Sequence, residues 1–498
     1  MDIVRVLERA CERHADRPAL SREGTTVSYA EVGERVPVVA GTLADLGVGQ
    51  GSTVGICSPD SIEAWLTIFA VWRLGALPAL IDARTPDDRL GYFVGDMDPA
   101  VVVSDDENRP RLAEILGIEA VRLADVVGAG GTATAPNDHD ESSPLFLSYT
   151  SGTTGDPKGV VLTSGPVTLG AACIAERLGY GMDDALVATT PVASSFQLVA
   201  SAMPALHTGA HVVLAAGHTP GEIWDDIAAH DGTVLVAYPL TLADVVGLAR
   251  ENRPSHGLRL ALSGGSPLAP RIKRDYREHL GIPLAESYGQ SELGGFMVLG
   301  TPGDESAPEG FAGRPLPDRL AYVADADNQE LPAGGVGEIV VTEGFFSEYR
   351  NKPDAYAKTT AGGVLHTGDV GIASATGHIK VLGRVQEADA AQRRGGFLRE
   401  VEDVAYDHPA VRHASVVIDV DGEVRCFVEL STPRSTDEGE IEEFIRARLK
   451  ESLFPAGVHI LEKFPRTFSG KADRLHLSTR SSTCRPVGTV QTSDKLRA

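Results

Sequence analysis

Residues 149–159 read YTSGTTGDPKG, and this stretch decides the fold. Glycines at positions 152, 155 and 159 allow backbone N–H groups to approach an anion closely. Hydroxyl donors come from four side chains, Thr150, Ser151, Thr153 and Thr154, and Lys158 adds a positive charge. The spacing differs from the GxxxxGK(S/T) pattern of P-loop proteins. We therefore expect these five side chains, together with the backbone of Gly152, to bind a polyphosphate.

Further short motifs follow downstream. They read SGGSPL at 263–268, YGQSE at 288–292, GEI at 337–339, TGD at 367–369, GR at 383–384 and RTFSGK at 466–471. With the loop, and in this order, they resemble the motifs of the adenylate-forming superfamily. That superfamily comprises acyl- and aryl-CoA ligases, peptide-synthetase adenylation domains and firefly-type luciferases. The resemblance covers about residues 10–475, nearly the whole chain.

Alternating hydrophobic patterns independently indicate an α/β fold with a largely parallel sheet. Helices are expected over 3–14, 30–47 and 60–74, and strands over 53–57, 76–82, 100–104, 212–214 and 234–236. A small α+β unit follows, with helices over 399–407 and 438–453 and strands over 414–418, 424–430 and 458–461. We predict an N-terminal AMP-binding domain over 1–383, a mobile C-terminal domain over 384–478 and a flexible tail over 479–498. The resemblance implies an active site in the cleft between the two domains.

The resemblance also implies a role for several residues in forming an acyl-adenylate from a carboxylic acid and ATP. Lys471 would bridge the carboxylate and the α-phosphate, and Ser291 would contact the α-phosphate. Glu292 would help to hold Mg²⁺, a hard cation that prefers oxygen ligands. Because charge develops on the phosphates during adenylation, these groups are expected to be catalytic.

The nucleoside of ATP is assigned to other motif residues. By resemblance, Gly264 and Gly265 lie in the loop on the adenine side, and Tyr288 with Gly289 flanks the base. Asp369 and Arg384 would bind the ribose hydroxyls. The expected cofactors and substrates are therefore ATP or AMP, Mg²⁺, coenzyme A and a carboxylic acid.

The segment after the hinge at 383–384 departs from the family pattern. Relatives usually have glycine near 392–393, whereas this chain has Arg393 and Arg394. In relatives this segment helps to form the tunnel through which the thiol reaches the adenylate. Two interpretations remain open: the arginines bind the phosphates of CoA, or they form a solvated basic turn and the tunnel is disrupted. The second suggests a protein that performs only one half-reaction well, with a second enzyme exchanging the acyl-adenylate.

The run 191–197, which reads PVASSFQ, departs from the family at the acyl pocket, where relatives often carry an aromatic residue or histidine. We assign Ser194, Ser195, Phe196 and Gln197 to the acid-binding pocket, with Gly294 beside them. Small side chains at 193–195 would leave room, so a bulky acid is expected. Phe196 is equally compatible with plain core packing.

Composition limits the other classes of function. The chain of 498 residues has 45 Lys plus Arg against 69 Asp plus Glu, a formal net charge of −24, so no nucleic acid is expected as a partner. Local cations must then bind the anionic substrates. Five scattered cysteines and a charged N-terminus favour the cytoplasm. The apolar stretch 62–81 contains Arg73, Gly75 and Pro78, and we interpret it as a core helix followed by a strand rather than a membrane span.

The leading hypothesis is thus an acyl-CoA ligase, an AMP-forming acid–thiol ligase. Besides the half-reaction specialist, three alternatives stay open: an adenylating enzyme that loads a carrier protein, a luciferase-like oxygenase and a non-catalytic nucleotide- or adenylate-binding regulator. The presence of both Lys158 and Lys471 argues against the regulator, because these are two of only nine lysines. The oligomeric state is not indicated by the sequence.

Overall fold

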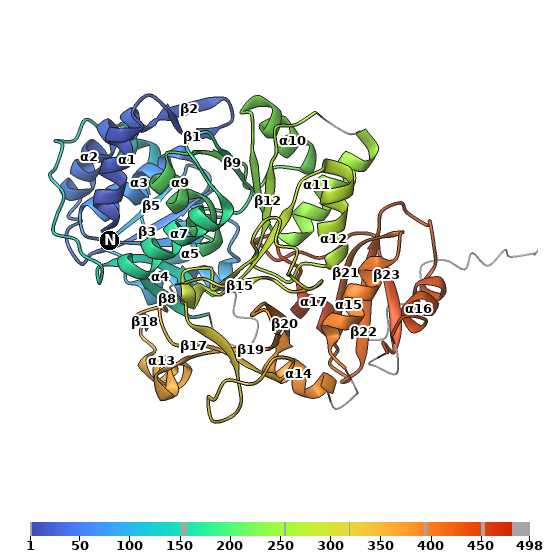
Figure 1. Cartoon of the computed structure of the whole chain (residues 1–498). Helices are drawn as coiled ribbons and strands as arrows, with labels where there is room; N and C mark the ends of the chain where they lie inside the picture. Colours follow the sequence, from blue (N-terminus) through green and yellow to red (C-terminus); the bar gives the residue numbers. More distant parts are fainter. Residues whose placement is uncertain are drawn as a thin grey trace, which may run out of the picture. The chain divides into compact units, whose positions relative to one another are not determined.

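The computed structural model describes residues 2–150, 157–252, 255–317, 319–392, 396–449 and 454–480. It divides into two compact units (Figure 1). The first comprises the described residues up to 390 together with Arg466–Lys471, and the second comprises the remaining described residues. The α/β fold predicted from the sequence is confirmed, while the boundaries at 383 and 478 stay a prediction.

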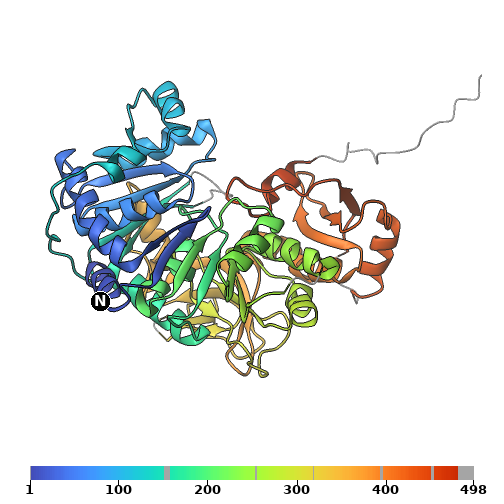
Figure 2. The same cartoon turned by 90° about the horizontal axis from the view of Figure 1, so that it is seen from above.

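The first unit contains two large, mostly parallel sheets accompanied by helices (Figure 2). The seven-stranded sheet has the order β18-β8-β7-β4-β3-β5-β6, with β3 (Thr53–Ser58), β4 (Leu77–Asp82), β5 (Val101–Ser104), β6 (Val121–Arg122), β7 (Pro144–Tyr149), β8 (Gly159–Thr163) and β18 (Glu348–Tyr349). The nine-stranded sheet has the order β15-β14-β13-β12-β11-β9-β10-β1-β2, with β1 (Pro18–Arg22), β2 (Thr25–Ser28), β9 (Ala185–Ala188), β10 (His211–Leu214), β11 (Val234–Ala237), β12 (Leu260–Ser263), β13 (Leu284–Tyr288), β14 (Val298–Leu299) and β15 (Arg314–Pro315).

The helices of this unit explain how the two sheets share a core. They are α1 (Ile3–Arg13), α2 (Tyr29–Asp45), α3 (Ile62–Arg73), α4 (Asp87–Met97), α5 (Asn108–Leu116), α6 (Leu123–Gly128), α7 (Ser164–Leu178), α8 (Ser195–Gln197), α9 (Met203–Thr208), α10 (Pro220–Ala229), α11 (Pro239–Asn252), α12 (Pro270–Asp275) and α13 (Pro353–Thr359), with the short turns η1 (Leu198–Ala202), η2 (Tyr276–Leu280), η3 (Ser291–Leu293) and η4 (Ala361–Gly363). Helix α14 (Val385–Gln392) begins in this unit and ends in the second. Helix α3 contacts β1 of one sheet and β3 and β4 of the other. It is buried nearly all round, as its continuous apolar sequence requires.

The apolar stretch 62–81 is therefore a core helix and a buried strand, α3 followed by β4, as predicted. Ser61 caps the helix by accepting a hydrogen bond from the backbone N–H of Ala64, and the left-handed Gly75 ends it. Among the described residues, no helix has the length and apolar character needed to cross a membrane.

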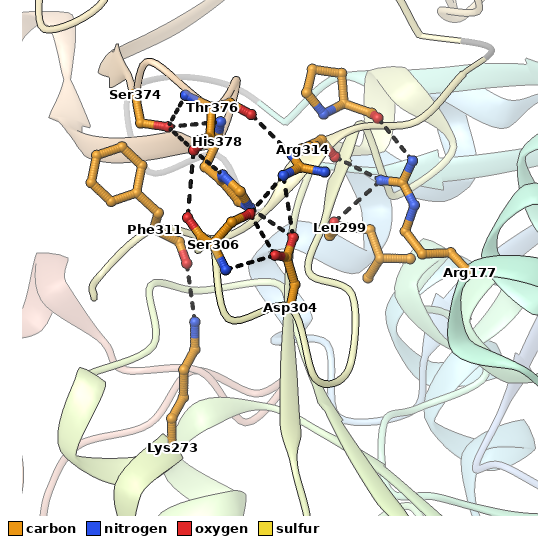
Figure 3. A network of polar contacts seen from close by, with 11 residues as sticks. Arg177, Lys273, Leu299, Asp304, Ser306, Phe311, Arg314, Ser374, Thr376 and His378 are labelled. Carbon is orange, nitrogen blue, oxygen red and sulfur yellow. Dashed lines mark hydrogen bonds and ion pairs between the residues drawn. The ribbon is translucent and has the colours of Figure 1, made fainter. Parts of the chain in front are cut away.

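A four-stranded antiparallel sheet completes the first unit. Its order is β16-β17-β19-β20, with β16 (Ala321–Ala324), β17 (Val336–Val341), β19 (Leu365–Ala373) and β20 (Ile379–Arg384). The turn between β19 and β20 is tied to the loop after β14 by the polar network in Figure 3. There Asp304 Oδ2 lies 3.1 Å from His378 Nε2, and Asp304 Oδ1 accepts hydrogen bonds from Ser306. The bonds from Ser306 lower the pKa of Asp304 to about 2, so this anchor stays charged at neutral pH.

The second unit is a three-stranded sheet with helices. Its elements are α15 (Leu398–Asp407), β21 (Val411–Ile418), β22 (Val424–Leu430), α16 (Glu438–Arg446), β23 (Gly457–Leu461) and α17 (Arg474–Thr479). Helix α16 ends at Arg446, before the predicted end at 453. The backbone N–H of Arg448 bonds to the carbonyl of Ile445, an i to i−3 bond that tightens the last turn. The predicted tail from 481 onward lies outside the described residues.

Candidate active site

The predicted polyphosphate loop is closed at its base by residues 150 and 158. The backbone N–H of Thr150 donates to the carbonyl of Lys158 at 3.0 Å, and the N–H of Lys158 donates to Thr150 Oγ1 at 3.0 Å. These bonds continue the antiparallel ladder of β7 and β8, in which Tyr149 pairs with Gly159. Ser151, Gly152, Thr153 and Thr154 lie outside the described residues, so their role stays a prediction.

Glu292, the predicted metal ligand, lies in η3 and is held by a tyrosine from a distant strand. Tyr349 Oη donates to Glu292 Oε1 at 2.7 Å, and the ring of Tyr349 lies under Lys158, with Nζ 4.6 Å from the ring centroid. No motif pointed to Tyr349. A single oxygen ligand of this kind fits Mg²⁺, which is usually bound by one or two carboxylates together with substrate phosphates. Ser291 precedes Glu292 in the same short turn.

Asp369 and Arg384 lie opposite each other, as partners in the register of β19 and β20. Arg384 Nε lies 3.1 Å from Asp369 Oδ1. The second carboxylate oxygen, Oδ2, accepts hydrogen bonds from Tyr288 Oη at 2.6 Å and from Gln290 Nε2 at 2.7 Å. Burial raises the pKa of Asp369, and the charge of Arg384 opposes that shift. Gln290 stands inside the YGQSE motif but was not singled out from the sequence.

The remaining motif on this side, GEI, has a structural explanation. Glu338 of β17 accepts a hydrogen bond from the backbone N–H of Gly368 at 2.8 Å. Gly368 has a φ of +68°, a conformation that glycine adopts without steric cost. Glu338 thus fixes the turn that presents Asp369.

Lys471 belongs to the segment 466–471, which by its contacts is part of the first unit. Its Nζ lies 5.2 Å from the ring centroid of Tyr238. A Cβ added to Gly265, which has a φ of +74°, would lie 3.2 Å from Lys471 Cε and 2.6 Å from the Tyr238 ring, so glycine is required there. Burial, and less strongly the positive charge of Arg384, lowers the pKa of Lys471 to about 8. Tyr238 is a further residue that the sequence did not reveal.

The predicted acyl run contacts Tyr238, the same residue that lies under Lys471. Ser194 Oγ lies 2.8 Å from Tyr238 Oη and also caps α8. Phe196 packs between Tyr238 and Phe296, with ring centroids 5.7 and 5.4 Å apart respectively, and it faces Gly264 closely. The adjoining η1 is a π-helical turn, a feature frequent at functional sites.

Three other residues assigned to the acid lie in packed surroundings. Gln197 is fully buried, and its Oε1 accepts a hydrogen bond from Thr190 at 2.9 Å. Ser195 is also buried. Gly294 ends η3 in a left-handed conformation, where a Cβ would lie 2.9 Å from Val167. Their contact with an acid stays a prediction.

A cavity of about 530 Å³ adjoins the start of the run, at Pro191 and Ala193. Its walls carry charges of both signs, among them Arg22, Arg84 and Asp60. Asp60 is 3 % exposed; its Oδ1 accepts a hydrogen bond from Trp65, while Oδ2 has no partner among the described residues. Burial raises the pKa of Asp60 to about 7. Arg393 and Arg394 lie outside the described residues, so neither interpretation of them is tested.

Comparisons with known proteins identify the family of this chain. Residues 7–348 match the family described as AMP-binding enzyme, and residues 400–471 match the AMP-binding enzyme C-terminal domain. A 2-succinylbenzoate–CoA ligase of Geobacillus kaustophilus is 30% identical over 476 residues, which is 93% of this chain and 94% of the relative. A sulfoacetate–CoA ligase of Cupriavidus necator is 28% identical over 88% of this chain and 90% of its own length.

A solved structure is also similar. The O-succinylbenzoate coenzyme A synthetase from Bacillus subtilis, in complex with ATP and magnesium ion, is 26% identical with a TM-score of 0.83 over 94% of this chain and 98% of its own. The fold and the order of the motifs thus lead to the same result. This chain belongs to the AMP-binding enzyme family, the adenylate-forming superfamily that its motifs predicted.

Proposed function

We propose that this chain is an AMP-forming ligase that joins a bulky, largely apolar carboxylic acid to CoA through an acyl-adenylate. The ligase activity through an adenylate, predicted from the motifs, agrees with the relatives, which are CoA ligases by name. The size and polarity of the acid are our inference. The observation that carries the proposal is the position of Lys471, which lies over Tyr238 beside both Gly265 and the Phe196 aromatic cluster.

In the first half-reaction a carboxylate oxygen attacks the α-phosphorus of ATP. A new C–O–P linkage forms, the bond to the bridging oxygen breaks, and pyrophosphate leaves. Lys471 supplies positive charge where the carboxylate and the α-phosphate meet, and this lowers the barrier by electrostatic stabilisation. Lys158 and the loop 150–158 hold the β- and γ-phosphates. When bound at Glu292, Mg²⁺ neutralises phosphate charge.

The ribose is oriented by Asp369 and Arg384. Asp369 is fixed by Tyr288 and Gln290, so its acceptor atoms are already in place before ATP binds. A preorganised acceptor costs little ordering entropy on binding. The motif resemblance assigns the nucleotide to this side of the site, and the fixed position of Asp369 supports that assignment.

In the second half-reaction the thiol of CoA attacks the acyl carbonyl carbon. The C–S bond forms, the C–O bond to the phosphate breaks, AMP leaves and the thiol proton passes to solvent. We place the phosphates of CoA at Arg393 and Arg394. Because that segment departs from the family pattern, exchange of the adenylate with a second enzyme remains a subsidiary hypothesis, supported by the sequence alone.

The acid is inferred from the aromatic cluster. Phe196, Tyr238 and Phe296 present ring faces and edges, which suit an aromatic or polycyclic acid. Relatives alone cannot identify it, because their names include both 2-succinylbenzoate and the small sulfoacetate. Among the described residues, Cys11, Cys57 and Cys426 are free thiols, which supports the cytoplasm as the compartment.

The test is mass spectrometry of products from a panel of acids, each with ATP and Mg²⁺, with and without CoA. We expect acyl-adenylate without CoA and thioester with it, with aromatic acids preferred over acetate. Preferential use of acetate would contradict the bulky pocket. Adenylate that never becomes thioester would instead support the half-reaction hypothesis.

A further inference from the structure

Tyr349 lies where the predicted metal ligand and the polyphosphate loop come together. It is the last residue of β18 and is 3 % exposed. Its phenol contacts Glu292, and its ring contacts Lys158. Both partners come from motifs, whereas Tyr349 does not, and Glu292 and Tyr349 are 57 residues apart in sequence.

The phenol hydrogen bond fixes one oxygen of the metal ligand. Tyr349 Oη donates to Glu292 Oε1 at 2.7 Å, a distance typical of a strong O–H···O⁻ bond. Among the described residues, Glu292 Oε2 has no hydrogen-bond partner. Carboxylates that bind metals are commonly oriented by such a neighbour, and loss of that neighbour typically weakens metal binding.

The ring supports the lysine of the loop. Lys158 Nζ lies 4.6 Å from the ring centroid, within the range of a cation–π contact. The same ring also contacts the ring of Phe346, with centroids 4.5 Å apart, and this contact restrains its orientation. The contact with Lys158 is thus made by the aromatic ring of Tyr349 and not by its hydroxyl group.

The backbone around Tyr349 forms hydrogen bonds to both η3 and β8. The N–H of Phe346 donates to the carbonyl of Glu292 at 2.6 Å. On the other side, the N–H of Arg350 donates to the carbonyl of Gly159 at 2.7 Å, and Tyr349 pairs with Val160 of β8. The five residues 346–350 thus connect η3 to the end of the loop through backbone hydrogen bonds.

We propose that Tyr349 is a positioning residue that couples binding of Mg²⁺ to binding of the ATP phosphates. Its phenol holds the Glu292 carboxylate for the metal, and its ring holds Lys158 for the phosphates. The inference rests on the proposed function, since it takes Glu292 as a metal ligand and the loop as the phosphate site. The hydroxyl and the ring of Tyr349 thus have separate roles. A Phe substitution removes only the hydroxyl, and a Leu substitution removes both the hydroxyl and the ring.

The test is calorimetric titration of the full chain with a non-hydrolysable ATP analogue, with Mg²⁺ and with EDTA, together with Mn²⁺ binding followed by electron paramagnetic resonance. For Tyr349→Phe we expect unchanged affinity for the analogue in EDTA, and roughly tenfold weaker Mn²⁺ binding to the complex. For Tyr349→Leu we expect the same metal loss and a few-fold weaker binding in EDTA, because the cation–π contact is lost as well.

Tyr322→Phe is the matched control, because it removes a phenol that donates to the Asn328 carbonyl at 3.2 Å, outside the site. It should leave both affinities unchanged. Wild-type metal binding in Tyr349→Phe would overturn the inference, as would equal losses of EDTA binding in the Phe and Leu variants. If the wild-type chain bound neither the analogue nor Mn²⁺, the proposed function itself would fail, which is a distinguishable result. Circular dichroism shows whether Tyr349→Leu folds, and Tyr349→Phe keeps the buried ring in any case.

Discussion

The side of the site assigned to the nucleotide and the side assigned to the acid are built by different means. On the nucleotide side, Asp369 accepts bonds from Tyr288 and Gln290 and pairs with Arg384, so polar atoms are fixed by one another. On the acid side, Phe196 is fixed by two other rings and by the absence of a side chain at Gly264. Hydrogen bonds fix direction, whereas packing fixes volume. The hydrogen-bonded nucleotide side can recognise one ligand precisely. On the packed acid side, a substitution that changes side-chain size can change which acid is accepted.

The largest expected effect on activity comes from replacing Lys471, which lies close to both the nucleotide side and the acid side. Lys471→Ala should lower the rate of adenylation by about 100- to 1000-fold, because it removes the positive charge from the point where charge develops. Conversion of a supplied synthetic acyl-adenylate and CoA to thioester should change only a few-fold. Rates are measured as pyrophosphate release and as thioester formation.

Lys463→Ala is the control for Lys471→Ala, because Lys463 is exposed and outside the motifs. It should leave both half-reactions at wild-type rates. Equal loss of both half-reactions in Lys471→Ala would mean that the lysine does not act in adenylation specifically.

The nucleotide side is broken by a change that keeps its shape. In Asp369→Asn only one side-chain oxygen can accept hydrogen bonds. It cannot replace both carboxylate oxygens, of which one faces Arg384 and the other accepts bonds from Tyr288 and Gln290. For Asp369→Asn we expect the KM for ATP to rise about 30-fold or more, with the KM for the acid within twofold of wild type. Asp106→Asn, which alters an exposed ion pair with Arg122, should change neither. A rise in the KM for the acid alone would show that the two sides are assigned the wrong way round.

The acid side is broken by adding volume. A Cβ at Gly264 would lie 2.2 Å from Phe196 Cε2 and 2.5 Å from Ser287 Oγ, so the ring must move. For Gly264→Ala we expect the KM for the preferred acid to rise about tenfold or more, with a smaller effect on ATP. Gly221→Ala, where the added methyl meets open space, is the control. A larger effect on ATP would instead support the adenine-side position that the motif resemblance implies for Gly264.

The sequence predicted most of the architecture but only part of this site. Local patterns determine the elements, whereas several site contacts join residues that are far apart in sequence. Helix α3 and strands β4 and β22 follow from local patterns, and all three were predicted. Asp369 and Arg384 were found because motifs mark them, and their pairing follows from strand register. Tyr238 and Tyr349 were missed because each contacts a site residue across a long stretch of chain, to Ser194 and to Glu292 respectively. No local spacing encodes such a contact.

The charge of Lys471 can also be removed by pH. Since burial lowers its pKa to about 8, the cation is present below pH 8 and is lost as the pH rises through that value. Adenylation should therefore fall about tenfold between pH 7 and 9, beyond any change in the thioesterification of a supplied adenylate. Lys471→Arg keeps its charge across this range and should flatten the profile, even if its absolute rate is lower. An unchanged high-pH limb in the arginine variant would assign that limb to another group.

The smallest effect concerns stability, at Asp60 in the wall of the cavity beside the acyl run. The Asp60 carboxyl is buried with an unpartnered oxygen, and burial raises its pKa to about 7, so it is protonated in the folded chain at acidic pH. In the unfolded chain it ionises near pH 4, hence the unfolded state is favoured increasingly as the pH rises from about 4 to 7, and the penalty persists above that. Asp60→Asn keeps an acceptor for Trp65 and carries no charge. It should therefore stabilise the protein by roughly 1–3 kcal/mol at pH 8 and by little at pH 4, measured as the shift in thermal midpoint at the two pH values. An equal shift at both values would assign the gain to packing or hydrogen bonding, because only ionisation of Asp60 makes the effect depend on pH.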